Sequence, residues 1–271
     1  MDVVFVGTGR LATNLAFALH SAGHHIVGLY SRTAASAQML AERLPGFSGV
    51  TTDSLSELPT ADVCIIAVKD AVISTLLPAL REGRESCCFY HTAGSVPLSV
   101  FEGTGLQHYG VLYPMQTFSK ERLVDFSHVP FYIEAVDEET LDRARKLALT
   151  VSDHVSELSS SARRHLHLAA VFACNFVNHC YELSAEVLEG CGLPFSAMHS
   201  LIEETARKAM TLHPHEAQTG PAVRYDEQVI EAQSLLLADQ PHLREVYDLM
   251  SQSIHRTHTQ PKSSHSLDNH D

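Results

Sequence analysis

The sequence contains no uncharged apolar run of the roughly 18 to 20 residues that a membrane span requires. Its start also lacks the basic region, long apolar stretch and cleavage site of a secretory signal peptide. Basic residues are few, because 19 Lys and Arg stand against 32 Asp and Glu, a net charge of −13. This balance argues against nucleic acid or an anionic membrane surface as the main partner. We therefore expect a cytoplasmic protein without a membrane or nucleic-acid partner.

The six cysteines lack the C-x-x-C spacing of redox and zinc motifs, and most stand within apolar stretches. We interpret them as buried thiols of a reducing compartment. They are Cys64, Cys87, Cys88, Cys174, Cys180 and Cys191. The 18 histidines form close pairs, but none has the i, i+4 spacing around a glutamate that a zinc hydrolase uses. We therefore expect no catalytic metal.

The most informative segment is a short apolar run at residues 3–6 that leads into glycines and then into an apolar-periodic helix pattern. A strand, a glycine turn and a helix start form the geometry that binds a dinucleotide pyrophosphate. One glycine permits the tight turn, the second lets the backbone approach the pyrophosphate, and free N–H groups of the helix donate to the anion. The predicted cofactor loop comprises Gly7, Thr8, Gly9, Arg10, Leu11 and Ala12. An ordinary strand-to-helix turn that binds nothing is the alternative.

The end of the second strand, residues 25–30, indicates which nicotinamide cofactor fits. An NAD site usually places Asp or Glu there for the ribose 2′-hydroxyl, yet no acidic residue occurs between Gly7 and Glu42. The residues present are Ser31, Arg32 and Thr33. A guanidinium can pair with a 2′-phosphate, so this segment favours NADP over NAD. Alternatively, Arg32 is a solvated residue at the start of the next helix, with Ser31 as its N-cap.

Strand and helix patterns alternate through the first half, which predicts an α/β fold with a doubly wound, mostly parallel Rossmann sheet. Ligands of such sheets lie beyond the carboxyl ends of the strands. Two later strand ends are therefore further candidates for cofactor binding, and they contain Ala67, Val68 and Lys69, and His91, Thr92 and Ala93. The segment 113–118 that follows is predicted as a loop, either a connecting turn or a wall of the nicotinamide pocket.

The pattern becomes helical after residue 155, with helices predicted at 159–190, 195–212, 226–238 and 241–257. We predict a Rossmann domain at 1–153, a helical substrate and dimerisation domain at 154–258, and a disordered tail at 259–271. Along the first long helix, polar residues recur at spacings of three and four and so share one face. These residues include His167 and Asn175, which either face substrate and nicotinamide between the domains or are satisfied polar groups of the core or a dimer interface.

Two more residues are candidates for holding the substrate. Arg164 could bind a substrate carboxylate or lie in solvent. Thr219 precedes a Gly-Pro turn and could present its hydroxyl to substrate. That turn also has a purely structural explanation, because Asp226 can cap the helix that follows and can pair with Arg224.

The sequence resembles the Rossmann-like NADP oxidoreductases that carry a C-terminal helical domain of unknown function. These are relatives of pyrroline-5-carboxylate reductase and of the 6-phosphogluconate dehydrogenase-like superfamily. The resemblance spans nearly all of residues 2–256, and its segments are residues 7–12, 31–33, 91–95, 113–118, 167–175 and 219–226. It implies NADP(H) bound at the N-terminal domain, an active site in a cleft and a homodimer formed through the helical domain.

The resemblance also identifies a difference. The β-hydroxyacid dehydrogenases of the superfamily carry a catalytic lysine four residues before an asparagine of this helix, where the present sequence has Val171. Hydroxyacid oxidation of that type is therefore not expected. Pyrroline-5-carboxylate reductases need no strong base, since they reduce an imine. Thr219 matches their hydroxyl near a Gly-Pro segment only loosely.

The hypothesis at this stage is an NADP(H)-dependent oxidoreductase that moves a hydride to or from a small carbonyl or imine compound. In this hypothesis His167 donates or relays a proton, Asn175 positions substrate or nicotinamide, and Arg164 or Thr219 holds the substrate. A dinucleotide-binding sensor or scaffold without catalysis is the alternative, which the missing lysine favours. A deazaflavin-linked reductase is a third, weaker one.

Overall fold

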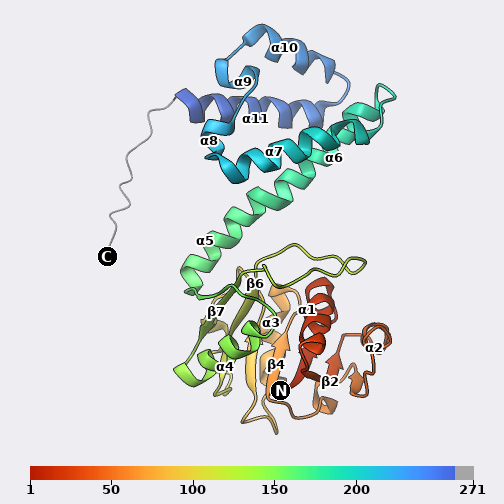
Figure 1. The fold of residues 1–271 in the computed structure, drawn as a ribbon, viewed down its shortest axis with the longest axis vertical. Helices are drawn as coiled ribbons and strands as arrows, with labels where there is room; N and C mark the ends of the chain where they lie inside the picture. Colours follow the sequence, from red (N-terminus) through yellow and green to blue (C-terminus); the bar gives the residue numbers. More distant parts are fainter. Residues whose placement is uncertain (260–271) are drawn as a thin grey trace, which may run out of the picture. The chain divides into compact units, whose positions relative to one another are not determined.

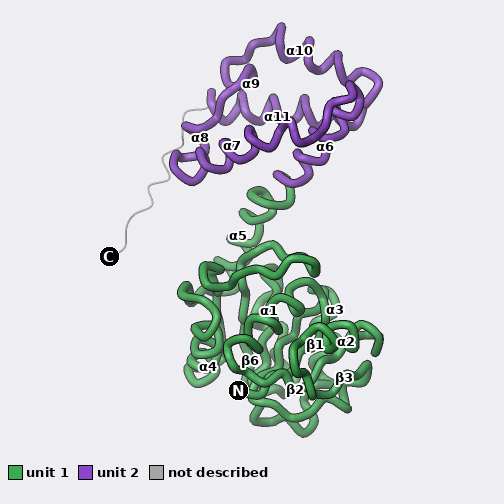
Figure 2. Tube along the Cα trace, turned by 45° about the vertical axis from the view of Figure 1, so that its right-hand side comes forward, with its two compact units in different colours: residues 1–176 green, residues 177–271 purple. Residues whose placement is uncertain are grey.

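The computed structural model describes residues 1–259, and these divide into two compact units (Figure 2). The first unit runs from Met1 to Phe176, and the second begins at Val177. The predicted tail at 259–271 lies outside the described residues, apart from Thr259. Among the described residues, no helix is long and apolar enough to cross a membrane.

An eight-stranded sheet forms the centre of the first unit (Figure 1), with the strand order β3-β2-β1-β4-β5-β6-β7-β8. All neighbouring strands are parallel except the antiparallel pair β6 and β7. The strands are β1 (Asp2–Val6), β2 (His25–Tyr30), β3 (Val50–Thr52), β4 (Val63–Ile66), β5 (Cys88–His91), β6 (Tyr109–Pro114), β7 (Phe131–Ala135) and β8 (Val155–Glu157). Chain order reverses between β1 and β4, the position where such sheets bind ligands.

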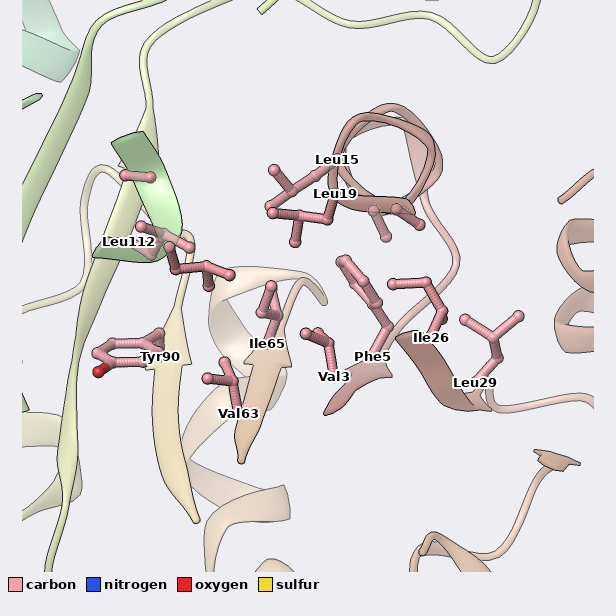
Figure 3. Close-up of a cluster of buried hydrophobic side chains, with 14 of the residues drawn as sticks. Val3, Phe5, Leu15, Leu19, Ile26, Leu29, Val63, Ile65, Tyr90 and Leu112 are labelled. Atoms are coloured by element: carbon pink, nitrogen blue, oxygen red, sulfur yellow. The ribbon is translucent and has the colours of Figure 1, made fainter. Parts of the chain in front are cut away.

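Helices cover both faces of the sheet, because the strands are apolar on both sides. Along β1, Val3 and Phe5 belong to one buried cluster (Figure 3), whereas Val4 and Val6 belong to another on the opposite face. The first cluster includes residues of α1 (Arg10–Ser21), α2 (Ala34–Ala41) and α4 (Glu138–Leu149). The second includes residues of α3 (Asp70–Leu76) and of the 3₁₀ helices η2 (Leu77–Leu80) and η3 (Leu98–Phe101). A third 3₁₀ helix, η1 (Leu55–Glu57), follows β3. The predicted doubly wound, mostly parallel fold is confirmed.

A long helical run then leads from the first unit into the second. It consists of α5 (Ser160–Ala170), a π-helical segment η4 (Val171–Phe176) and α6 (Val177–Glu189). The second unit is helical throughout its described part. Its elements after α6 are η5 (Phe195–Met198), α7 (His199–Thr211), α8 (Pro214–Ala217), α9 (Pro221–Arg224), α10 (Glu227–Leu236) and α11 (Pro241–Thr259). Asp226 caps α10 as expected, since its carboxylate accepts a hydrogen bond from the Val229 N–H.

Three expectations from the sequence need correction. Cys64, Cys87 and Cys88 are buried, but Cys174 is only partly buried, and Cys180 and Cys191 are exposed. Residues 113–118 are not wholly a loop, because β6 continues to Pro114 through its pairing with β7. The strands β3 and β8 are absent from the sequence prediction because each has only three residues, too few to show a period-two pattern.

Candidate functional site

The glycine turn after β1 has the geometry that the sequence predicts. Gly7 has φ +109°, and a Cβ there would lie 2.3 Å from the Ala67 carbonyl oxygen, so only glycine fits. The Gly7 N–H donates to the Tyr30 carbonyl at 2.8 Å. The turn is thus held between the ends of β4 and β2, at the point where the strand order reverses.

Gly9 differs from Gly7, because nothing in the described protein requires a glycine at this position. Its φ is −72°, which any residue adopts, and a Cβ there would meet no atom within 4 Å. Gly9 is also the N-cap of α1, where no side chain caps the helix and no acidic residue stands in the first turn. An open helix N-terminus without a carboxylate is a binding site for an anion. The space over Gly9 and the N-terminus of Arg10–Ala12 therefore fit a dinucleotide pyrophosphate.

The residues after β2 lie at the surface. Arg32 and Thr33 are exposed, Ser31 is partly buried, and the Ser31 N–H donates to the Thr52 carbonyl at 3.1 Å. Thr33 is the N-cap of α2, so the suggestion that Ser31 caps this helix is wrong. The Arg32 guanidinium makes no ion pair within residues 1–259. It is consequently available to a phosphate.

The end of β4 lies directly beside the glycine turn. The Ala67 N–H donates to the Val6 carbonyl at 2.8 Å, and Val68 Cγ1 is 3.0 Å from the place of a Gly7 Cβ. Lys69 follows as the exposed N-cap of α3. The structure thus brings Ala67 and Val68 together with the predicted cofactor loop.

The side chain of His91, at the end of β5, is part of the core. It is fully buried and stacks on Phe101 with 5.7 Å between the ring centroids. Its Nδ1 accepts a hydrogen bond from the Ala93 N–H at 3.2 Å, whereas its buried Nε2 has no hydrogen-bond partner within residues 1–259. Burial lowers the pKa of His91 to about 3, and the positive charge of Arg163 acts in the same direction. This imidazole is therefore neutral, and Thr92 and Ala93 beside it are buried too.

His167 lies against the loop that follows β5, on the first unit. A Cβ on Gly94 would be 2.6 Å from the Nδ1 of His167, so a glycine is required for this close approach. The Tyr113 hydroxyl lies 3.1 Å from the same Nδ1, and the two rings meet edge to face. The predicted candidate His167 is therefore paired with Tyr113, at the carboxyl end of β6.

Tyr113 itself is nearly buried, with 8% of its surface exposed. Burial raises the pKa of its phenol; Arg163 opposes this effect, and the Asp70 carboxylate adds to it. Asp70 begins α3 and accepts a hydrogen bond from the hydroxyl of Ser95, the residue after Gly94. Asp70, Ser95, Tyr113 and His167 thus form one cluster of polar side chains at the carboxyl edge of the sheet.

A buried ion pair fixes the helix that carries His167, and sequence reasoning missed it. Arg163 is fully buried, and it donates to the Glu134 carboxylate at 2.5 Å and to the Val96 carbonyl at 2.6 Å. Ser160 donates to Glu134 through its N–H at 2.9 Å and its hydroxyl at 2.7 Å. Burial alone would raise the pKa of Glu134, but these hydrogen bonds outweigh it and lower the pKa. The sequence feature that could have indicated this ion pair is Glu134, a glutamate within the otherwise apolar strand β7.

A second buried polar residue, Asn14 of α1, holds the long connection between β6 and β7. Its amide donates to the Ser119 carbonyl at 2.7 Å and to the Arg10 carbonyl at 2.9 Å, and its oxygen accepts from the Val124 N–H at 2.8 Å. Figure 1 draws this connection, residues 115–130, above α1. The connection is therefore fastened to α1, the helix that follows the glycine turn.

The other predicted substrate residues are not part of this cluster. Arg164 is exposed, and Asn175 is exposed within the π-helical segment η4. The spacing rule for a common face assumes an α-helix, whereas a π-helix bonds residue i to residue i+5, so the rule does not hold across η4. Thr219 is exposed in the second unit. The expected Arg224–Asp226 pair is absent from the ion pairs of the described chain.

Comparisons with known proteins agree with this architecture. Residues 1–112 match the model of a Rossmann-like domain, and residues 129–254 match that of a domain of unknown function, DUF2520. A crystal structure from Bacteroides fragilis, of a protein named as a candidate NADP oxidoreductase, shares 48% identity. The match covers 94% of this chain and 98% of that one, with a TM-score of 0.89.

More distant structures share the fold alone. An imine reductase from Streptomyces aurantiacus is 14% identical, with 94% of each chain covered and a TM-score of 0.65. A pyrroline-5-carboxylate reductase from Coxiella burnetii is 18% identical, with 94% of this chain and 96% of that one covered and a TM-score of 0.56. No curated protein sequence matches the chain.

Proposed function

Since the chain belongs to the family of the Bacteroides fragilis protein, with a Rossmann-like domain followed by a DUF2520 domain, we propose that it is an NADP(H)-dependent oxidoreductase. Its reaction transfers a hydride to or from a small carbonyl or imine compound. The observation that carries the proposal is Gly9, a glycine that the protein's own packing does not need, at an uncapped helix N-terminus. The names of the distant imine and pyrroline-5-carboxylate reductases support the substrate class.

The preference for NADP over NAD depends on Arg32. The segment after β2 offers this exposed guanidinium and the hydroxyls of Ser31 and Thr33, and it holds no carboxylate that would repel a 2′-phosphate. The backbone of the segment 67–69 and of the segment 91–93 lines the continuation of the cofactor site. When bound, the cofactor supplies or accepts the hydride, while the protein orients the reactants and excludes water.

The proposal keeps the substrate roles that the sequence and the family resemblance suggest. His167 donates or relays the proton that accompanies the hydride. Asn175 positions the substrate or the nicotinamide, and Arg164 or Thr219 holds the substrate. The pairing of His167 with Tyr113 supports the first of these roles, and the exposure of the other three side chains leaves them accessible to a ligand.

Titration of the purified protein with NADPH and NADH, followed by nicotinamide fluorescence, tests the cofactor. Arg32→Ala should weaken NADPH binding about 10- to 100-fold, because a charge-assisted hydrogen bond contributes about 1.5 to 3 kcal/mol, and should leave NADH binding unchanged. Gly9→Val should weaken both without loss of stability, because its side chain enters only the open space. Arg207→Ala, which removes an exposed arginine of the second unit, is the control. The proposal is falsified if the wild type binds neither nucleotide.

A non-catalytic dinucleotide sensor is the second candidate function. It is favoured by Val171, which stands where the β-hydroxyacid dehydrogenases carry their catalytic lysine. Turnover of NADPH with a panel of small aldehydes, ketones and cyclic imines distinguishes the two functions. Turnover that falls in His167→Ala and Asn175→Ala supports the enzyme. Tight binding with no turnover supports the sensor.

We also propose that the protein is a homodimer. Support comes from large apolar side chains that are exposed at every fourth residue along the helical run, with Leu168 56%, Phe172 62% and Phe176 50% exposed. Phe172→Glu should shift the mass measured by light scattering from dimer to monomer. Met39→Glu replaces a residue of α2 that is 63% exposed and should leave the mass unchanged. A wild-type monomer at micromolar concentration would refute the proposal.

A further inference from the structure

The closest pairing of titratable side chains in the polar cluster is that of Tyr113 with His167. Their hydrogen bond is 3.1 Å long, and it joins the end of β6 to α5. The Gly94 backbone supports the His167 ring from one side, at a distance that admits no Cβ. His167 is therefore held between the end of β6 and the loop after β5.

The hydroxyl of Tyr113 can accept one hydrogen bond and donate another at the same time. The Nδ1 of His167 can make only one hydrogen bond, because a ring nitrogen is either a donor or an acceptor. The Nδ1 is already occupied by Tyr113, and Tyr113 stands at the carboxyl edge of the sheet, where ligands of this fold bind. We propose that Tyr113 delivers the proton to the substrate and that His167 replaces that proton, an inference that rests on the proposed function.

The charges around the Tyr113 phenol require that His167 replace the proton that Tyr113 gives to the substrate. A Tyr113 phenolate would be a buried anion, and the Asp70 carboxylate disfavours it further. Arg163 opposes this effect, but its own charge is paired with Glu134. A proton that comes from His167 during the transfer avoids the phenolate altogether. The pair thus begins as a phenol beside an imidazolium and ends as a phenol beside a neutral imidazole.

In the direction of reduction, a bound reduced nicotinamide would supply a hydride to the substrate carbon, and the electron pair of the C=O or C=N bond would move onto oxygen or nitrogen. That atom takes the proton of the Tyr113 hydroxyl while the phenol oxygen takes the proton from His167 Nδ1. Solvent then protonates His167 again. The product is an alcohol or amine, and one solvent proton is consumed per turnover.

Arg163 and Glu134 are positioning residues in this proposal. Arg163 lies one turn before His167 on α5, and its bonds to Glu134 and to the Val96 carbonyl tie that turn to β7 and to the loop after β5. The loop after β5 also contains Gly94. The ion pair consequently fixes both partners of the contact between His167 and Gly94.

The test compares Tyr113→Phe, His167→Gln and Tyr132→Phe in the full-length protein loaded with NADPH. Tyr132 is the cross-strand neighbour of Tyr113 on β7, so it controls for loss of a nearby hydroxyl. Tyr113→Phe should reduce kcat for the reduction about 100- to 10,000-fold, the contribution of a general acid, with NADPH binding unchanged. Turnover should fall with rising pH in the wild type and lose that dependence in His167→Gln. Tyr132→Phe should behave as the wild type.

A second measurement needs no substrate. In ¹⁵N-histidine NMR of the loaded protein, the His167 signal is identified by its absence in His167→Gln. Its Nδ1 resonance should shift in Tyr113→Phe, because this ring nitrogen loses its hydrogen-bond partner, and should not shift in Tyr132→Phe. An unshifted Nδ1 resonance in Tyr113→Phe overturns the relay, as does full turnover of that variant. Failure of the wild type to bind NADPH would instead refute the proposed function.

Discussion

The ion pair between Glu134 and Arg163 leads to a quantitative prediction for Glu134→Gln. The glutamate accepts hydrogen bonds from the Ser160 N–H, the Ser160 hydroxyl and the Arg163 guanidinium. A glutamine keeps one oxygen and places an NH₂ donor against one of these donors, and it leaves the fully buried guanidinium without a countercharge. Breaking a buried pair from one side costs about 3 to 5 kcal/mol of the free energy of unfolding.

Hydrogen exchange of the β5 and β7 amides measures this loss in the first unit alone. At about 1.4 kcal/mol per factor of ten, the slowest amides should exchange roughly 100- to several 1,000-fold faster in Glu134→Gln. Glu157→Gln is the matched control, since Glu157 pairs with Arg145 at the surface, where 59% of its side chain is exposed, and such pairs contribute about 1 kcal/mol or less. A Glu134→Gln variant that exchanges no faster than the control would refute the view that this pair holds α5.

Three further predictions concern the same edge of the sheet. Folding lowers the pKa of His91 from 6.5 to about 3, so between these pH values the unfolded chain binds one more proton than the folded chain. The free energy of unfolding should therefore decrease as the pH falls from 6.5 toward 3. His91→Phe should flatten this pH dependence, measured by urea unfolding. Gly94→Ala should push His167 away, cost about 1 to 3 kcal/mol through overpacking and lower turnover, whereas an unchanged His167 NMR spectrum would count against the contact. Asn14→Ala should speed amide exchange at Val124, and equal rates would show that another contact holds the connection.

The sequence was sufficient for the glycine turn and for the alternation of strands and helices. A glycine with positive φ, as at Gly7, and a period-two apolar pattern are local properties, and both are visible in a single chain segment. The prediction of His167 as a candidate came from its place on a helix face. Its partners could not be predicted, because Gly94 and Tyr113 stand 73 and 54 residues away in the chain.

The sequence by itself determined the Rossmann-type order of elements and the position of the glycine turn, because the physical causes lie within a few consecutive residues. Only the tertiary structure distinguished Gly7, which packing requires, from Gly9, which packing leaves free. It also decided that Glu134 and Arg163 form a buried pair and that Tyr113 meets His167. These contacts depend on which strands become neighbours in the sheet, and that order arises from the burial of the whole core at once.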